Sequence, residues 1–318
     1  MKKIIVVYYD TKHTKYEFEK ERISDTSTIK TANEIAKILN AKTLSLSGNI
    51  NKDINLIQKI KPDIIFNLVE DYNSLSQNEY RFVSALELLD FKFTGNNSNS
   101  LMICLDKSLC KQILISEKIN TPRFKLFKKN DEINFKYFPC IVKPNFSDAS
   151  RGISNESIIF NLNDLRSQVK FILEKYKQNV LVEEFIRGKE LHVSILEGKI
   201  LNIGEIDFKD IKDDYRKIIS YDAKWITESF EFKNTVSIIP AKIGNKTKKR
   251  VEIFALKCYE VLKLNSYARI DMRLKNNKMY VIDINPNPDI SRNDYFALAA
   301  FSKGISYEDL IYKISNFT

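Results

Sequence analysis

Two acidic motifs near the C-terminus have the residue types that a divalent metal requires. Arg269-Ile-Asp271 and Asp283-Ile-Asn285 each place polar side chains at one end of an apolar run. Carboxylate and amide oxygens suit Mg²⁺, which also takes oxygens from substrate phosphates. Solvated acids on surface turns would explain Asp271 alone, but not acids beside apolar runs at both motifs. The motifs therefore predict a magnesium site for a phosphorylated ligand.

These acids need two paired strands to position them. The runs Tyr267–Leu274 and Met279–Ile284 are separated by a short polar turn, which predicts a hairpin that brings the two acids side by side. Alternation along the second strand puts Asp283 on the face opposite Ile282 and Ile284.

A lysine and a polar loop form the second candidate feature. The predicted strand Phe138–Lys143 ends at Lys143 and leads into the polar loop Pro144–Gly152. Loop amides can cradle phosphates, and a lysine supplies a positive charge. Taken alone, a lysine that snorkels from a strand end is the better interpretation.

A third feature is the predicted strand Val180–Glu184. The exposed backbone of Glu184–Ile186 can pair with an adenine edge, and the Glu190 carboxylate can accept hydrogen bonds from ribose hydroxyls. Many antiparallel strands look like this, so the feature is weak alone.

The elements around these features indicate an α/β protein. A strand–helix–strand–helix order at the N-terminus predicts a small α/β unit with parallel strands and, lacking G-x-G-x-x-G, no dinucleotide site. The later part predicts further helices, an antiparallel pair of strands and a polar, irregular segment that is a candidate mobile loop. The predicted elements are strands at Ile4–Tyr9, Asp63–Leu68, Glu190–Leu196 and Lys199–Phe208, helices at Thr28–Leu39, Tyr80–Leu89, Asp106–Ile119, Asn163–Tyr176, Lys246–Leu262, Asp294–Ser302 and Tyr307–Ile314, and the polar segment Ile211–Lys233.

Composition excludes several classes of function. The 318 residues carry a net charge of +10, but the lysines are scattered and the densest basic run has no interleaved aromatics, so a nucleic-acid partner is not favoured. The chain lacks a run of the ~20 apolar residues that a membrane span needs, so no membrane partner is expected. Four cysteines without C-x-x-C spacing predict free buried thiols and a reducing, cytoplasmic setting.

Ordered motifs over three-quarters of the chain resemble the ATP-grasp superfamily, and within it the D-alanine–D-alanine ligase-like carboxylate–amine ligases. The motifs are IIFNLVED (64–71), FTGNNSNSLMICLDK (93–107), INTPRF (119–124), FPCIVKP (138–144), VLVEEFIRGKELHVSIL (180–196), YDAKW (221–225), ARIDMRL (268–274), DINPNPDIS (283–291) and GISYEDLI (304–311).

The resemblance implies an ATP-grasp fold with an N-terminal α/β domain (1–103), a small central ATP-binding subdomain (104–186) and a larger C-terminal subdomain with an antiparallel sheet (187–318). It also implies roles for individual residues: Lys107 and Lys143 at the phosphates, Ser150 in the loop over them, Glu183, Glu184, Phe185 and Ile186 at adenine, Glu190 at ribose, Lys224 at the transferred phosphate, Arg269 at the tetrahedral intermediate, and Asp271, Asp283 and Asn285 as ligands of a pair of Mg²⁺ ions, with Mn²⁺ as a possible substitute.

The implied reaction has two steps. A carboxylate takes the γ-phosphate of ATP to give an acyl phosphate and ADP, and an amine then attacks the carbonyl and expels phosphate. Metals and cations carry most of such catalysis because the reactants share negative charge. The implied partners are small carboxylate and amine substrates, and a homodimer is possible because related ligases are commonly dimers.

The acceptor half departs from the D-alanine–D-alanine ligase pattern. The stretch YYDTKHTKYEFE lacks the early Gly-rich loop and its glutamate. Trp225 occupies a position where the family commonly has a tyrosine. Asp289 and Asp294 occupy positions where the family has a glycine and a serine. In one interpretation, Asp294 would repel an acceptor carboxylate and could pair with an ammonium group. In the other, Asp289 and Asp294 are helix-start residues that face solvent and have no role in binding substrate.

Three functions therefore stay open. We expect an ATP-dependent ligase on amino-acid or small-peptide substrates, with Trp225, Asp289 and Asp294 as candidate substrate contacts. The alternatives are a D-alanine–D-alanine ligase of peptidoglycan synthesis and, more remotely, a non-catalytic nucleotide-binding protein.

Overall fold

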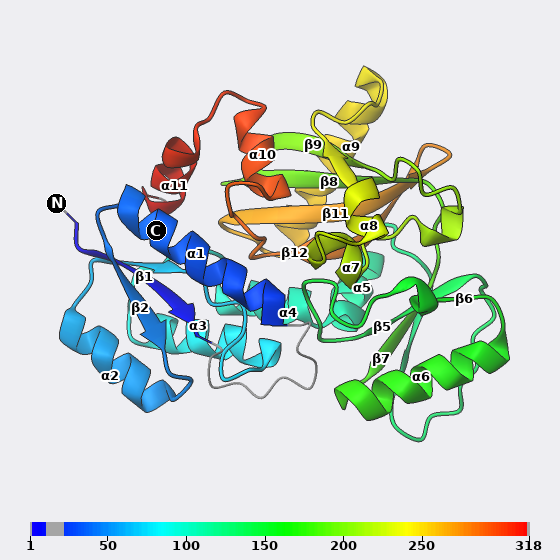
Figure 1. Cartoon of the computed structure of the whole chain (residues 1–318), viewed down its shortest axis with the longest axis horizontal. Helices are drawn as coiled ribbons and strands as arrows, with labels where there is room; N and C mark the ends of the chain where they lie inside the picture. The colour runs from blue at the N-terminus through cyan, green and yellow to red at the C-terminus, as the bar shows by residue number, and fades with distance from the viewer. Residues whose placement is uncertain (1, 11–21, 317–318) are drawn as a thin grey trace.

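The computed structural model describes residues 2–10 and 22–316. Within these residues the strands form three sheets, one parallel and two antiparallel, each with helices packed against it (Figure 1). This mixture confirms the predicted α/β class with an N-terminal parallel sheet and a C-terminal antiparallel sheet.

The N-terminal sheet is parallel and has the order β2-β1-β3. Its central strand consists of β-branched and aromatic residues, which favour a buried strand. The prediction of β1 is confirmed, whereas β2 and α2 were not among the predicted elements. The bounds are β1 (Ile4–Tyr9), α1 (Arg22–Ile38), β2 (Lys42–Leu46), α2 (Ile50–Ile60), β3 (Ile64–Asn67), η3 (Ser76–Asn78) and α3 (Glu79–Leu88).

The central sheet is antiparallel and has the order β4-β7-β5-β6. The apolar face of α6 packs against it through Leu165, Val169 and Ile172. The bounds are β4 (Phe124–Phe127), β5 (Cys140–Pro144), η4 (Asn155–Ser157), β6 (Ile158–Ile159), α6 (Leu162–Tyr176) and β7 (Val180–Glu184).

The C-terminal sheet is the largest and has the order β10-β9-β8-β11-β12. Helix α9 covers one face, together with α4 and α5. Asp106 caps α5, since its side chain accepts a hydrogen bond from Leu109 N–H. The bounds are α4 (Ser98–Leu105), α5 (Lys107–Ser116), β8 (Lys189–Leu196), β9 (Lys199–Asp207), β10 (Val236–Ile238), α9 (Asn245–Val261), β11 (Tyr267–Lys275) and β12 (Lys278–Asn285).

The last helices return to the start of the chain. The helices α10 (Tyr295–Phe301) and α11 (Tyr307–Asn316) share a core with β1 and α1, and Figure 1 shows α11 beside α1. Helix α5, which the sequence analysis groups with the central subdomain, packs in the core of the C-terminal sheet. The domain boundaries at 103/104 and 186/187 stay a prediction.

The polar segment Ile211–Lys233 is more regular than predicted. It contains η5 (Asp214–Arg216), α7 (Tyr221–Trp225) and all but the last residue of α8 (Phe230–Asn234), and serine side chains cap both α-helices. Short capped helices lack the long apolar periodicity that reveals a helix in sequence.

Two predictions from composition can be compared with the structure. All four cysteines, Cys104, Cys110, Cys140 and Cys258, are free and buried, as predicted. None of the helices in the described part of the chain is long and apolar enough to cross a bilayer.

Candidate active site

The two predicted acidic strand ends lie side by side. Asp271 of β11 and Asp283 of β12 are cross-strand partners, and Asn285 Nδ2 donates to Asp271 Oδ2 at 2.9 Å. A β-bulge follows this pair, so Ile282 and Asp283 both line the same pocket, while Ile284 belongs to the core. The predicted face of Ile282 is therefore wrong, because a bulge breaks strict alternation.

Lys107 contacts Asp283. Its Nζ lies 3.0 Å from both carboxylate oxygens and 3.5 Å from Asp148 Oδ1. Burial would raise the pKa of Asp283, but the nearby ammonium groups of Lys107 and Lys143 bring it below its usual range. Asp283 is therefore held as a carboxylate.

Lys143, which is predicted to contact phosphate, belongs to a buried triad of charged side chains. Glu183 lies between Lys143 Nζ, at 2.7 Å, and Lys111 Nζ, at 2.6 Å. Burial opposes the charge of Glu183, yet the two lysines lower its pKa. Lys111 was not predicted; its i,i+4 spacing from Lys107 on a helix was the available signal.

A pocket of about 890 Å³ lies beside the central sheet. It is lined by every residue that was predicted to contact adenine or ribose: Glu183, Glu184, Phe185, Ile186 and Glu190. Glu184 N–H and Phe185 N–H donate to the carbonyls of Arg123 and Pro139. Both oxygens of Glu190 have partners, Arg273 Nη2 at 2.6 Å and His192 Nε2 at 3.4 Å. We call this the nucleotide-sized pocket.

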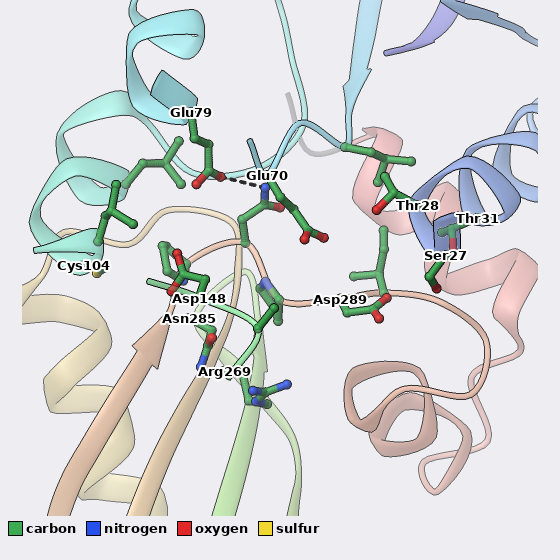
Figure 2. A pocket seen from close by; sticks show the side chains of 18 of the residues that line it. Ser27, Thr28, Thr31, Glu70, Glu79, Cys104, Asp148, Arg269, Asn285 and Asp289 are labelled. Atoms are coloured by element: carbon green, nitrogen blue, oxygen red, sulfur yellow. Dashed lines mark hydrogen bonds between the residues drawn. The ribbon is translucent and has the colours of Figure 1, made fainter. Parts of the chain in front are cut away.

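A second pocket of about 930 Å³ lies against the N-terminal sheet, and we call it the acidic pocket. Figure 2 shows Glu70 pointing into it, with Glu79 on one side and Ser27, Thr28 and Thr31 of α1 on the other. Burial raises the pKa of Glu79 well above its usual range, and Asn287 Nδ2 donates to its Oε1 at 2.9 Å. None of these residues was predicted, because they come from elements far apart in the chain.

The two pockets share a wall. Ala149, Lys224, Arg269 and Asn285 line both of them. Arg269 donates to both oxygens of Asp271, at 2.8 and 3.0 Å, and Asp271, Asp294 and Tyr295 raise its pKa despite burial. The charged guanidinium of Arg269 and the side chain of Lys224 thus lie where the two pockets meet.

The predicted loop and substrate residues surround this wall. Ser150 lines the nucleotide-sized pocket, and Trp225 and Asp289 line the acidic pocket. Asp289 Oδ1 accepts from Ser291 N–H at 2.7 Å. Of the stretch YYDTKHTKYEFE (8–19), residues 11–19 lie outside the described residues.

Asp294 does not behave as a solvated helix-start residue. It is the N-cap residue of α10, but its side chain makes no capping hydrogen bond, and its Oδ1 lies 3.6 Å from Arg269 Nη1 with 11% of the side chain exposed. The solvent-facing alternative is therefore wrong for Asp294.

This buried carboxyl predicts a pH-dependent stability. Burial first, and then Asp289, raise the pKa of Asp294 from 3.8 to about 6. Between pH 4 and pH 6, Asp294 keeps its proton in the folded chain and loses it in the unfolded chain. The free energy of unfolding therefore falls as the pH rises from about 4 to about 6. Asp294→Asn should remove this loss and become more stable than the parent above pH 6, by on the order of 1–3 kcal/mol. Urea unfolding at pH 4 and pH 7.5 tests this; the same difference at both pH values would contradict it.

The donor set fits a hard cation. No cluster of three or more histidine, cysteine, aspartate or glutamate side chains with metal-binding geometry occurs within the described ranges. The donors available to a cation between β11 and β12 would be Asp271, Asp283 and the Asn285 amide oxygen, completed by phosphate oxygens, which is the coordination that Mg²⁺ favours.

The two antiparallel sheets, with the nucleotide-sized pocket lined by residues of both, match the fold of a solved D-alanine–D-alanine ligase, which makes this an ATP-grasp enzyme. The family model for the D-Ala–D-Ala ligase C-terminus matches residues 112–316. The chain therefore belongs to the D-alanine–D-alanine ligase family, and it is an ATP-dependent, ADP-forming ligase that makes carbon–nitrogen bonds.

Individual relatives agree with this assignment. The chain is 32% identical to D-alanine–D-alanine ligase A of Bacillus cereus over 289 residues, covering 89% of this chain and 90% of that protein. It is 28% identical to D-alanine–D-alanine ligase B of Clostridium perfringens, covering 82% and 83%. The crystal structure of the Bacillus anthracis ligase complexed with ATP superposes with a TM-score of 0.76 at 25% identity, covering 100% of this chain and 97% of that one.

Proposed function

We propose that the chain joins two molecules of D-alanine, phosphorylating the carboxylate of the first and joining it to the amine of the second. The names of the relatives support these substrates. The observation that carries the proposal is the shared wall: ATP in the nucleotide-sized pocket would present its γ-phosphate to an acid in the acidic pocket.

In this proposal the residues of the chain divide the work. Asp271, Asp283 and Asn285 hold Mg²⁺, which when bound neutralises phosphate charge, and Lys143 adds a positive charge beside them. Glu183–Ile186 and Glu190 hold the nucleoside. Arg269 faces the reacting carboxyl and stabilises the oxyanion that forms when the amine attacks.

The test is ADP formation over a panel of acids and amines. With ATP and Mg²⁺, D-alanine should give ADP and D-alanyl-D-alanine in equal amounts, identified by mass and chiral chromatography. L-alanine should give neither. If D-alanine supports no ADP formation while another pair does, the substrate assignment is wrong.

A second candidate differs in the acceptor. Asp289 lines the acidic pocket, and Asp294 lies behind its wall, 3.6 Å from Arg269 Nη1. These two carboxylates would repel an acceptor carboxylate and attract a second ammonium group. This favours a ligase that joins D-alanine to a diamine or a basic amino acid. The same panel, extended with D-lysine and putrescine, separates the two: faster amide formation with these acceptors than with D-alanine would favour the second candidate.

Lys224 gives a kinetic prediction. It lines both pockets, and its Nζ lies 4.8 Å from the centre of the Trp225 ring. Because its charge is needed most while the phosphoryl group moves, Lys224→Ala should lower kcat by about 100-fold and change the KM for ATP by less than about threefold. Steady-state kinetics tests this, and an equal loss of ATP affinity would contradict it.

A further inference from the structure

The loop over the two pockets has a conformation that its neighbours must hold. Ala149 and Ser150 have φ values of 55° and 60°, in the left-handed region that non-glycine residues seldom adopt. At Gly152, with φ of 77°, a Cβ would lie 2.7 Å from Pro144 Cγ, so the loop folds tightly onto β5. Such a conformation persists where surrounding contacts over-determine it.

Two contacts join this loop to the α7 region. Ser150 Oγ donates to the carbonyl of Ile219, and Trp225 Nε1 donates to the carbonyl of Ala149, both at 2.9 Å. Both contacts belong to the C-terminal side of the site.

A third contact reaches the opposite wall. Arg151 Nη1 lies 2.8 Å from Asp71 Oδ2, and the side chains are only 19% and 12% exposed. Ser76 Oγ donates to the other oxygen of Asp71 at 2.5 Å and so fixes this carboxylate. Asp71 directly follows Glu70, which lines the acidic pocket.

We propose that Arg151 and Asp71 are a positioning pair, the 71–151 latch. It keeps the loop around Ala149–Gly152 closed between formation of the acyl phosphate and attack by the amine. An acyl phosphate can react with the amine, giving amide and phosphate, or with water, giving back the acid and phosphate. The second reaction consumes ATP without product. The latch joins the loop to the wall that carries Glu70, so it couples ATP cleavage to amide formation by excluding water.

The inference depends on the ligase chemistry and not on the identity of the substrates. A second ion pair provides a matched control. Arg292 Nε lies 2.7 Å from Glu34 Oε1 and so joins α1 to the C-terminal part of the chain, but Arg292 and Glu34 line neither pocket.

The first experiment measures amide formed per ADP released, with D-alanine as donor and acceptor. Arg151→Gln and Asp71→Asn should each lower this ratio at least about threefold while ADP release continues, because water reaches the intermediate. The double variant should lose no more than either single one, since the two residues act as one contact. Arg292→Gln should keep the parental ratio. An unchanged ratio in both single variants, or losses that add in the double variant, would overturn the latch.

The second experiment needs neither the carboxylate nor the amine substrate. Trp225 is the single tryptophan of the chain and contacts the loop at Ala149. Both single variants should raise the acrylamide quenching constant of its fluorescence by about twofold in the presence of ATP and Mg²⁺, whereas Arg292→Gln should not. If D-alanine gives no amide with the parent, the proposed substrates fail, but the quenching still decides on the latch. Unchanged quenching in both variants would overturn it.

Discussion

Replacing Glu183 with glutamine is expected to lower the free energy of unfolding by about 3–5 kcal/mol, the cost of removing one partner from a buried ion pair. Glu183 is 1% exposed, and its carboxylate is the counter-charge for Lys111 and Lys143, which are 3% and 6% exposed. Glutamine leaves both ammonium groups buried without the carboxylate that contacts them directly. Urea unfolding monitored by circular dichroism measures the loss.

The neighbouring residue offers a matched control. Glu184 is also a glutamate of β7, but its side chain is 32% exposed and lies 4.0 Å from Arg123. Glu184→Gln should therefore cost less than about 1 kcal/mol. Combining Glu183→Gln with Lys111→Met should recover part of the stability, because one of the two unpaired charges disappears. Equal losses for the two glutamates would contradict the role of the triad.

Replacing Asp283 with asparagine is expected to reduce ADP formation by at least about 100-fold with little loss of secondary structure, because a bound metal supplies several kcal/mol of charge stabilisation. Asparagine keeps an oxygen that can accept from Lys107 but loses the negative charge. Initial rates of ADP release over a Mg²⁺ titration measure the effect.

Asp148→Asn separates a metal ligand from a general loss of negative charge. Asp148 contacts the same Lys107 ammonium, at 3.5 Å, but is not a predicted ligand. Its replacement should cost less than about tenfold in rate. If Asp283→Asn keeps parental turnover at all Mg²⁺ concentrations, the metal assignment is wrong.

Sequence patterns were sufficient where one element carries its own signal. The continuous apolar run of β1 and the hairpin of β11 and β12 are confirmed, because burial and pairing follow from local composition. Strand β2 is short and mostly exposed, so its alternation is weak. Helix α2 was also missed, although Ile50, Ile54 and Ile57 have helical spacing.

The site was less predictable because its contacts join distant elements. The pairing of Lys111 with Glu183 links α5 to β7, and the latch links the segment after β3 to the loop after β5. Neither contact leaves a local pattern. The bulge that turns Ile282 toward the nucleotide-sized pocket likewise depends on pairing with β11.

The account rests on phosphoryl transfer to a carboxylate at the wall that the two pockets share. Isotope transfer tests this most directly: D-alanine labelled with ¹⁸O in its carboxyl group is incubated with ATP and Mg²⁺, and the released phosphate is analysed by mass spectrometry. The account predicts one ¹⁸O atom in each phosphate released, because the carboxyl oxygen that attacks the γ-phosphate leaves with it. Turnover that releases unlabelled phosphate together with ADP would contradict it.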